Sequence, residues 1–262
     1  MGFVLFAIIG LLGGFRSVLI FYIMLFGMQF CLEGLHRTRM MPVLLASALV
    51  MGAAIIPFTN KLPLTFQRCL SFLPVDVNPA VKADAASSTE WRLEMWKTIA
   101  PEIPRYFWIG KGFTATAADY YLTSQAVRLG LLRDFENSMI AGDYHSGPLS
   151  IIIPFGIWGV LAFLFLIGAS LHVLTRNYRH GDPAVRHINT FLLAYFLTRV
   201  ISFVFMFGAA HIDIPALAGL AAFSMSLNGG LCRVRVPVRE SSAPAPAVPA
   251  RAHPRRWMPA RS

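Results

Sequence analysis

Four positively charged or imidazole side chains lie in an otherwise apolar chain, at places that suggest chemistry. Arg16 follows an apolar segment, Arg92 lies in a long polar loop, and His145 lies where that loop meets the next apolar segment. Arg199 lies inside a further apolar segment. A guanidinium group can hold a phosphate through two parallel hydrogen bonds. An imidazole can accept a proton from a hydroxyl near neutral pH.

Each of the first three residues also has a structural interpretation. Arg16 can extend its head group to the membrane surface and serve no substrate. Arg92 can form a surface salt bridge with Glu90 or Glu94, and such exposed pairs are common and weak. His145 can be a structural histidine at an interface. Residue type alone leaves both interpretations open at all three positions.

Arg199 requires a partner or a cavity. A charge at this depth costs at least about 2.5 kcal/mol on insertion scales, so it faces protein or water. We expect a functional role or an internal ion pair. His211 and Asp213, at the end of the same apolar segment, can join the site or form an ordinary polar turn. Asp143 can orient His145, but two residues are too few for a metal site.

Composition indicates an integral membrane protein. The chain has 262 residues, 56% hydrophobic and 14% charged, with a mean hydropathy of +0.58. The net charge of +10 is dispersed over short connections and the C-terminal tail, so we expect no nucleic-acid partner. The three cysteines have no C-x-x-C spacing, which predicts neither a metal cluster nor a disulfide framework. We expect no cofactor.

The fold class predicted is an all-α integral membrane protein with about six transmembrane helices. A helix needs roughly 20 apolar residues to cross a bilayer core of about 30 Å. The N-terminal segment lacks a basic n-region, so we expect no secretory signal. The predicted spans are Gly2–Gly14, which is short, Val18–Leu32, Pro42–Phe58, Leu149–Thr175, Ile188–Ala210 and Pro215–Leu231.

Charge sets the expected orientation. Arginines gather in the connections after the second and fourth spans and in the tail, which predicts that these parts are cytoplasmic. Between spans three and four lies a large loop with nine Lys/Arg and nine Asp/Glu, which we expect to be periplasmic. The predicted divisions are 1–58 with three spans, 59–148 for the loop, 149–232 with three spans, and 233–262 for a disordered basic tail.

The large loop is predicted to be partly helical. Ser87-x-x-Glu90 has the pattern of a capping box, which predicts a helix start there. The helix is expected to run to about Ala100, because Pro101 and Pro104 follow.

The order of these motifs resembles the C-terminal half of the O-antigen ligase and O-antigen polymerase family of bacterial membrane glycosyltransferases. No single motif is specific, and the weight lies in their order and their placement around the loop. The motifs are Gly-Phe-Arg-Ser at 14–17, Arg92-x-x-x-Trp96, Gly110-Lys111-Gly112-Phe113, Asp143-Tyr144-His145 and Phe155-Gly156-Ile157-Trp158-Gly159. The glycines of the third motif also predict a tight turn.

The resemblance implies transfer of a glycan from undecaprenyl-pyrophosphate to lipid A-core, or to another glycan chain, on the periplasmic side of the inner membrane in lipopolysaccharide biosynthesis. It implies that Arg16 and Arg92 bind pyrophosphate, that His145 acts on the acceptor, and that neither metal nor nucleotide sugar takes part. Arg199, Asp143 and His211 are the expected substrate-binding residues. The alternative is a transporter fragment or a non-catalytic accessory membrane subunit.

Overall fold

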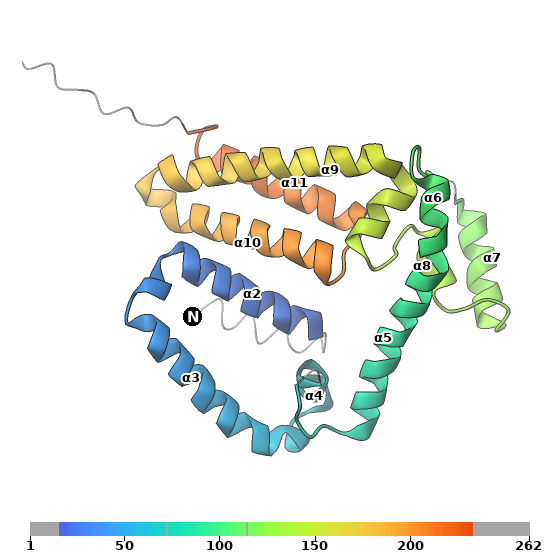
Figure 1. The fold of residues 1–262 in the computed structure, drawn as a ribbon, viewed down its shortest axis with the longest axis horizontal. Coiled ribbons are helices and arrows are strands. Elements are labelled where there is room, and N and C mark those ends of the chain that lie inside the picture. Colours follow the sequence, from blue (N-terminus) through green and yellow to red (C-terminus); the bar gives the residue numbers. More distant parts are fainter. Residues whose placement is uncertain (1–15, 72, 114, 233–262) are drawn as a thin grey trace, which may run out of the picture.

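The computed structural model describes residues 16–71, 73–113 and 115–232, and within them every regular element is helical (Figure 1). The predicted span Gly2–Gly14 and the tail 233–262 lie outside the described residues. The elements are α2 (Arg16–Leu32), η1 (Leu35–Arg37), α3 (Met40–Ile55), η2 (Ile56–Lys61), α4 (Leu64–Leu70), α5 (Pro79–Ile99), η3 (Ala100–Glu102), α6 (Ile103–Tyr106), α7 (Ala117–Arg128), α8 (Glu136–Ile140), α9 (Gly147–His180), η4 (Pro183–Val185), α10 (Arg186–Phe205) and α11 (Ala210–Leu227).

Helix α10 is the centre of a helix bundle. It packs against α2, α9 and α11, and α9 also packs against α11 (Figure 1). Their facing sides bury large apolar side chains, among them Phe196, Phe203 and Leu217. Burying each such side chain contributes about 1.5–3 kcal/mol where water is the alternative. The core therefore fixes the relative positions of the helices whose ends form the site described below.

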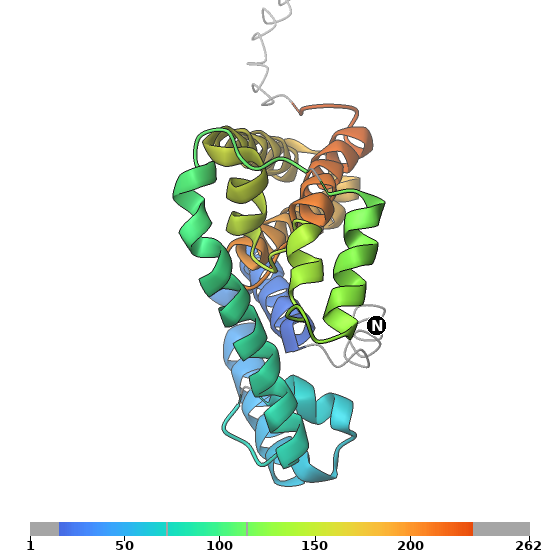
Figure 2. The same ribbon diagram turned by 90° about the vertical axis from the view of Figure 1, so that its right-hand side faces the viewer.

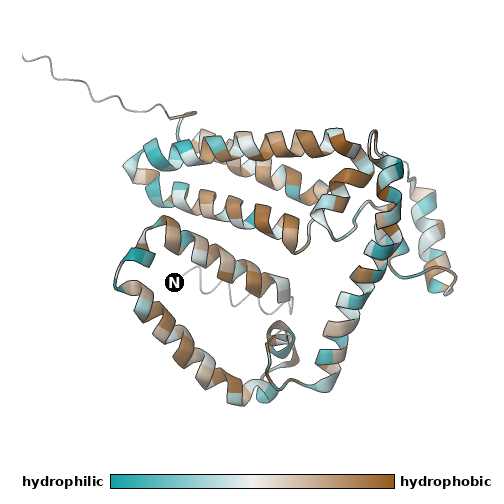
Figure 3. Ribbon diagram, viewed as in Figure 1, coloured by the Kyte–Doolittle hydropathy of each residue, from teal (hydrophilic) through white to brown (hydrophobic). Residues whose placement is uncertain are grey.

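Four helical segments are long and apolar enough to cross a membrane: Met40–Lys61, Gly147–His180, Pro183–Phe205 and Ala210–Leu227. Ser17–Leu32 is apolar but shorter. Figure 3 shows hydrophobic residues dominating these helices, whereas α5 and α7 are mixed. The all-helical class is confirmed for the described residues, and four of the six predicted spans meet the length criterion there.

Helices α5 to α8 lie at one end of the bundle (Figures 1 and 2). Helix α5 rises past the end where α9 begins and α10 ends, and α7 packs against α8. We call this the loop end of the bundle. In α3, by contrast, none of the residues is buried, so its apolar surface faces away from the described protein core.

The predicted start of the loop helix at Ser87 is wrong. Helix α5 begins eight residues earlier, at Pro79, because Asn78 caps it by accepting the Ala80 N–H at 2.9 Å. Proline at the first helical position is favoured, since its missing N–H needs no partner there. The Ser87 hydroxyl instead donates to the Asp84 carbonyl at 3.0 Å inside the helix. The predicted end near Ala100 is confirmed.

The boundary between the last two predicted spans also differs. Helix α10 ends at Phe205 instead of Ala210, and α11 begins at Ala210, five residues before Pro215. The Asp213 carboxylate accepts the Ala209 N–H at 2.9 Å and satisfies a donor at the helix start. The hydrogen bond from Asp213 back to Ala209 favours a helix start before Pro215, which lies inside α11.

Candidate functional site

The segment Gly142–His145 is the centre of the site. It joins α8 to α9, and Gly142 has a φ of 71°. His145 has a φ of 48°, which is uncommon for a residue other than glycine. Such a conformation persists only when surrounding contacts hold it, and it is enriched at functional sites.

Asp143 holds His145 in this conformation. Its Oδ1 accepts the His145 backbone N–H at 3.1 Å and lies 3.3 Å from the imidazole Nδ1. The ring nitrogen is out of line for a hydrogen bond and has no other partner among the described residues, although it is buried. The short distance makes Asp143 the group that faces Nδ1. A carboxylate in this place favours a proton on Nδ1 and leaves Nε2 as an acceptor.

Helix α5 positions the segment from the side. The Trp91 ring meets the His145 ring edge to face, with centroids 5.1 Å apart. One turn further, Trp96 donates its indole N–H to the Tyr144 carbonyl at 2.8 Å. Tyr144 itself is buried against Ile99 and its neighbours. Burial, followed by the nearby Glu102 charge, raises the pKa of Tyr144 to about 12, so its hydroxyl stays protonated.

The predicted turn at Gly110 and Gly112 exists, and both residues have positive φ angles of 82° and 71°. It docks on a break in α9 at Gly156, whose φ is 66°. The Lys111 N–H donates to the Ile153 carbonyl at 2.7 Å, and the Gly112 N–H donates to the Pro154 carbonyl at 2.9 Å. These carbonyls lose their helical donors at the break, so the turn replaces the missing hydrogen bonds.

A cavity of about 310 Å³ opens beside His145, and we call it the histidine cavity. It lies at the loop end, between the start of α2, the segment before α9, the outer part of α10 and the start of α11. Its lining is Ser17, Val18, Phe21, Tyr22, Asp143, His145, Tyr195, Arg199, Ser202, Phe207, Ala209, Ile212 and Asp213.

Arg199 has an internal ion partner in this cavity. Its Nε lies 2.7 Å from Asp213 Oδ1, and its Nη1 lies 3.5 Å from the Tyr195 hydroxyl. The other Asp213 oxygen is engaged by the Ala209 N–H. The pair joins α10 to α11 and neutralises the arginine charge. The ion pair explains how α10 tolerates the Arg199 charge in largely apolar surroundings.

The structure brings together three of the six predicted site residues, His145, Asp143 and Arg199. Arg16 is the first residue of α2, directly before the lining residue Ser17, and its side chain lies outside the description. Arg92 is half-buried on α5, one turn before Trp96 and next to Trp91. It thus shares a helix face with the residue that contacts Tyr144.

His211 is placed differently from the other five. It is exposed at the start of α11, and the cavity is lined instead by its neighbours Ile212 and Asp213. The residue that sequence reasoning missed is Tyr195, which lies one turn before Arg199 and packs edge to face on Phe21 of α2. Its spacing of four residues from Arg199 is the signal that was available.

The described residues contain no group of three or more His, Cys, Asp or Glu able to hold a metal ion. What the cavity offers is an imidazole oriented by a carboxylate, a neutralised arginine and hydroxyl groups. This set can move a proton and bind polar groups at the end of a helix bundle.

Fold and site together define a helical membrane protein with a polar cavity at one end of its bundle. A comparison with family models identifies which kind: the O-antigen ligase family matches residues 1–164. The match covers more than half of the chain, and the chain belongs to this family. Comparisons with curated proteins and with solved structures gave no match. Arg16, Arg92 and His145 lie within the matched segment, whereas Arg199 and Asp213 lie beyond it.

Proposed function

We propose that this protein transfers a glycan from undecaprenyl-pyrophosphate to lipid A-core or to another glycan chain. Family membership supports a glycosyltransferase of the O-antigen ligase or polymerase type. The observation that carries the proposal is the imidazole of His145, with Asp143 Oδ1 3.3 Å from its Nδ1, at the wall of a cavity. A carboxylate beside one ring nitrogen supports a role for the other ring nitrogen as a general base acting on a hydroxyl.

In the proposed reaction, the acceptor hydroxyl gives its proton to Nε2 of His145 as its oxygen attacks the anomeric carbon of the donor sugar. The bond between that carbon and the phosphate oxygen breaks, and its electron pair leaves with undecaprenyl pyrophosphate. Asp143 stabilises the imidazolium that forms, as a carboxylate does beside a catalytic histidine. The walls of the histidine cavity would hold the acceptor hydroxyl in line with the anomeric carbon of the donor. This positioning lowers the activation barrier.

Arg16 and Arg92 are the proposed pyrophosphate ligands. Their charge offsets the negative charge that develops on the leaving group, and such preorganised stabilisation is usually the largest catalytic term. Arg199 is less suited to this task than the sequence suggested, because Asp213 already pairs with it at 2.7 Å. Its proposed role is to shape the cavity wall against which the lipid phosphate lies, next to Tyr195.

The proposed location is the inner membrane, with the loop end in the periplasm. The distribution of charge supports this orientation. Residues 59–148 carry equal numbers of basic and acidic residues. At the opposite end of the bundle, Arg179 lies in the last turn of α9 and Arg186 is the first residue of α10. Cytoplasmic connections carry an excess of such residues.

A transporter fragment or accessory subunit is the competing function. A transporter binds its substrate near the bilayer midplane, often between broken helices. Here the histidine cavity is lined by the first residues of α2 and α11 and by Tyr195, Arg199 and Ser202 from the last three turns of α10. A site at the ends of helices favours chemistry at the membrane surface over passage through the bilayer.

The test replaces His145 and, separately, Arg92 by alanine in cells that depend on this protein for surface polysaccharide. We expect a loss of about 100-fold or more in transfer for His145→Ala, because general base catalysis contributes about 10²–10⁴-fold. Surface polysaccharide is measured by gel electrophoresis of extracted lipopolysaccharide, and protein levels by immunoblotting of membranes.

Two exposed residues give matched controls. His187→Ala removes a histidine whose side chain is 85% exposed at the other end of the bundle. Arg128→Ala removes an exposed arginine from the last turn of α7. Both should leave polysaccharide unchanged. Normal polysaccharide in His145→Ala cells that hold normal protein levels would overturn the proposed function.

A further inference from the structure

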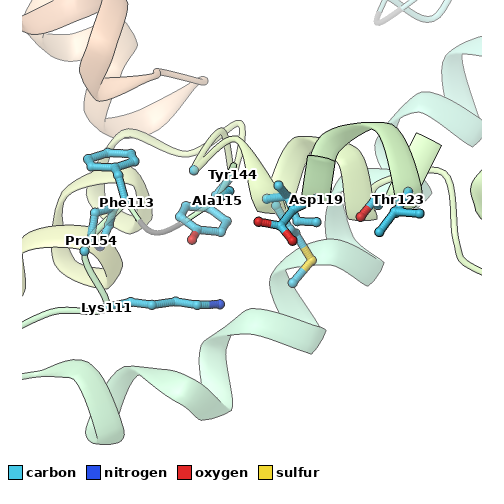
Figure 4. A pocket seen from close by; sticks show the side chains of 12 residues that line it. Lys111, Phe113, Ala115, Asp119, Thr123, Tyr144 and Pro154 are labelled. Atoms are coloured by element: carbon cyan, nitrogen blue, oxygen red, sulfur yellow. The ribbon is translucent and has the colours of Figure 1, made fainter. Parts of the chain in front are cut away.

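A second cavity, of about 400 Å³, lies in the loop on the other side of Tyr144, and we call it the loop cavity (Figure 4). The segment 142–145 separates the two cavities, and its residues face them alternately. Gly142 and Tyr144 line the loop cavity, and Asp143 and His145 line the histidine cavity. The loop cavity lining is Lys111, Gly112, Phe113, Ala115, Asp119, Leu122, Thr123, Met139, Ile140, Gly142, Tyr144 and Pro154.

The walls of the loop cavity are fixed by hydrogen bonds. Backbone N–H groups of Lys111 and Gly112 donate to carbonyls of α9 at 2.7 and 2.9 Å. At the start of α7, Asp119 Oδ2 accepts the Thr116 N–H at 2.7 Å, and Asp119 N–H donates to the Thr116 hydroxyl at 3.3 Å. Tyr144 is held by Trp96 at 2.8 Å. A cavity with three anchored walls is preorganised for a ligand.

The lining contains one basic side chain, Lys111, one acidic side chain, Asp119, and the aromatic ring of Phe113. In Figure 4 the Lys111 side chain extends along the cavity towards the side where Asp119 and Thr123 lie. The Asp119 carboxylate accepts hydrogen bonds from the Thr116 N–H and then from the Thr116 hydroxyl, which lower the pKa of Asp119, so the carboxylate is ionised. One ammonium group and one carboxylate cancel, which disfavours a phosphate or another simple anion. The Phe113 ring packs edge to face on Phe155 of α9, with centroids 5.4 Å apart, and still leaves 59% of the residue exposed.

We infer that the loop cavity binds sugar units of a glycan. A sugar has hydroxyls that match an ammonium donor and a carboxylate acceptor, and an apolar face that can pack on the exposed ring of Phe113. The volume lies in the range of about 300–1,000 Å³ typical of ligand pockets. The two charged side chains in the lining disfavour binding of a lipid tail. The inference rests on the proposed function, because that function supplies two glycans, one on the donor and one on the acceptor.

The test measures binding directly, by isothermal titration calorimetry on the full-length protein in detergent. Two probes separate the sources. One is the oligosaccharide released by mild acid from the undecaprenyl-pyrophosphate pool of the producing cells. The other is the deacylated core oligosaccharide of their lipopolysaccharide. Binding of the first assigns the cavity to the donor, and binding of the second assigns it to the acceptor.

Two pairs of variants locate the binding. Ala115→Trp places a large side chain in the cavity, whereas Ala118→Trp adds the same side chain at an exposed residue of α7 outside the lining. Lys111→Gln removes the lining ammonium, whereas Lys97→Gln removes an exposed one from α5. We expect Ala115→Trp and Lys111→Gln to weaken binding at least about tenfold, which corresponds to about 1.4 kcal/mol. The two controls should bind as the unaltered protein does.

Failure of this inference differs from failure of the proposed function. His145→Ala should bind the same oligosaccharide while it loses transfer, because His145 lines the other cavity. Binding of neither probe, or equal binding by Ala115→Trp and Ala118→Trp, overturns the loop cavity as a glycan site. Because Lys111→Gln leaves the backbone donors in place, it decides the question if Ala115→Trp does not fold.

Discussion

The ion pair between Arg199 and Asp213 permits a quantitative prediction about the bundle. The two side chains join α10 to α11 at 2.7 Å and are only 24% and 9% exposed. We consider the variants Arg199→Gln and Asp213→Asn and the double variant that carries both. The asparagine keeps an oxygen for the Ala209 N–H, so the substitution removes charge and spares the helix cap.

The expected magnitude follows from burial. Two unit charges about 4 Å apart attract by about 4 kcal/mol at an effective dielectric constant of about 20. Removing one partner of a buried pair costs about 3–5 kcal/mol, because the other charge stays uncompensated. The partial exposure of Arg199 places the cost near the lower end, at about 3 kcal/mol. At about 2–4 °C per kcal/mol, each single variant should lower Tm by about 6–12 °C.

The assay is thermal unfolding of the purified protein in detergent, arranged as a double-mutant cycle. We expect the double variant to lose clearly less than the sum of the two single losses, with a coupling of about 2 kcal/mol. The pair Arg68 and Asp84 provides a matched control cycle. It has a similar distance of 2.9 Å, but its side chains are 39% and 53% exposed. Its coupling should be only about 0.2–1 kcal/mol.

Strict additivity at Arg199 and Asp213 would refute this reasoning. The arginine would then draw its stabilisation from elsewhere, and a phosphate ligand in the cavity would become the better explanation of its presence in α10.

Three further predictions concern the support of the site. Trp96→Phe removes the indole donor to the Tyr144 carbonyl and should reduce transfer at unchanged membrane levels, by about 1 kcal/mol in barrier or about fivefold, measured as polysaccharide per unit protein. Gly156→Ala should lower Tm, because its φ is 66° and a Cβ would lie 2.9 Å from the Gly110 nitrogen, whereas Gly168→Ala, with open space around it, should not. Tyr144 ionises near pH 10 in the unfolded chain and only near 12 in the folded protein, so stability should fall as pH rises from about 10 to 12. Tyr144→Phe should show a shallower fall in Tm over that pH range. An equal fall in both proteins would contradict this prediction.

Much of the fold could be predicted, because apolar length alone identifies membrane helices. The boundaries that failed depended on single caps. Asn78 and Pro79 outweighed the capping-box pattern at Ser87, and Asp213 starts α11 before Pro215. A cap is formed by one side chain, and several local patterns compete for that role in a sequence.

Candidate site residues could be named from the sequence, but only some of their contacts could be. Asp143 and His145 are two residues apart, so their contact could be anticipated from the chain. The partner of Arg199 lies 14 residues away, across the turn between α10 and α11, whose geometry no periodic pattern specifies. The loop cavity could not be predicted from the sequence for the same reason. Its lining comes from distant segments, which meet only because the turn at 110–112 docks on α9.

Under the proposed function, the break at Gly156 sets the depth at which transfer would take place. Helix α9 has 34 residues and would be about 51 Å long if continuous, far more than a hydrocarbon core of about 30 Å needs. The part after the break is alone long enough to cross, at roughly 36 Å. The part before it is therefore free to stand above the bilayer, tied to the loop and carrying His145 at its start. Under the proposed function, donor and lipid A-core acceptor are both anchored in the membrane, and the break would place His145 at the height where their sugar parts meet.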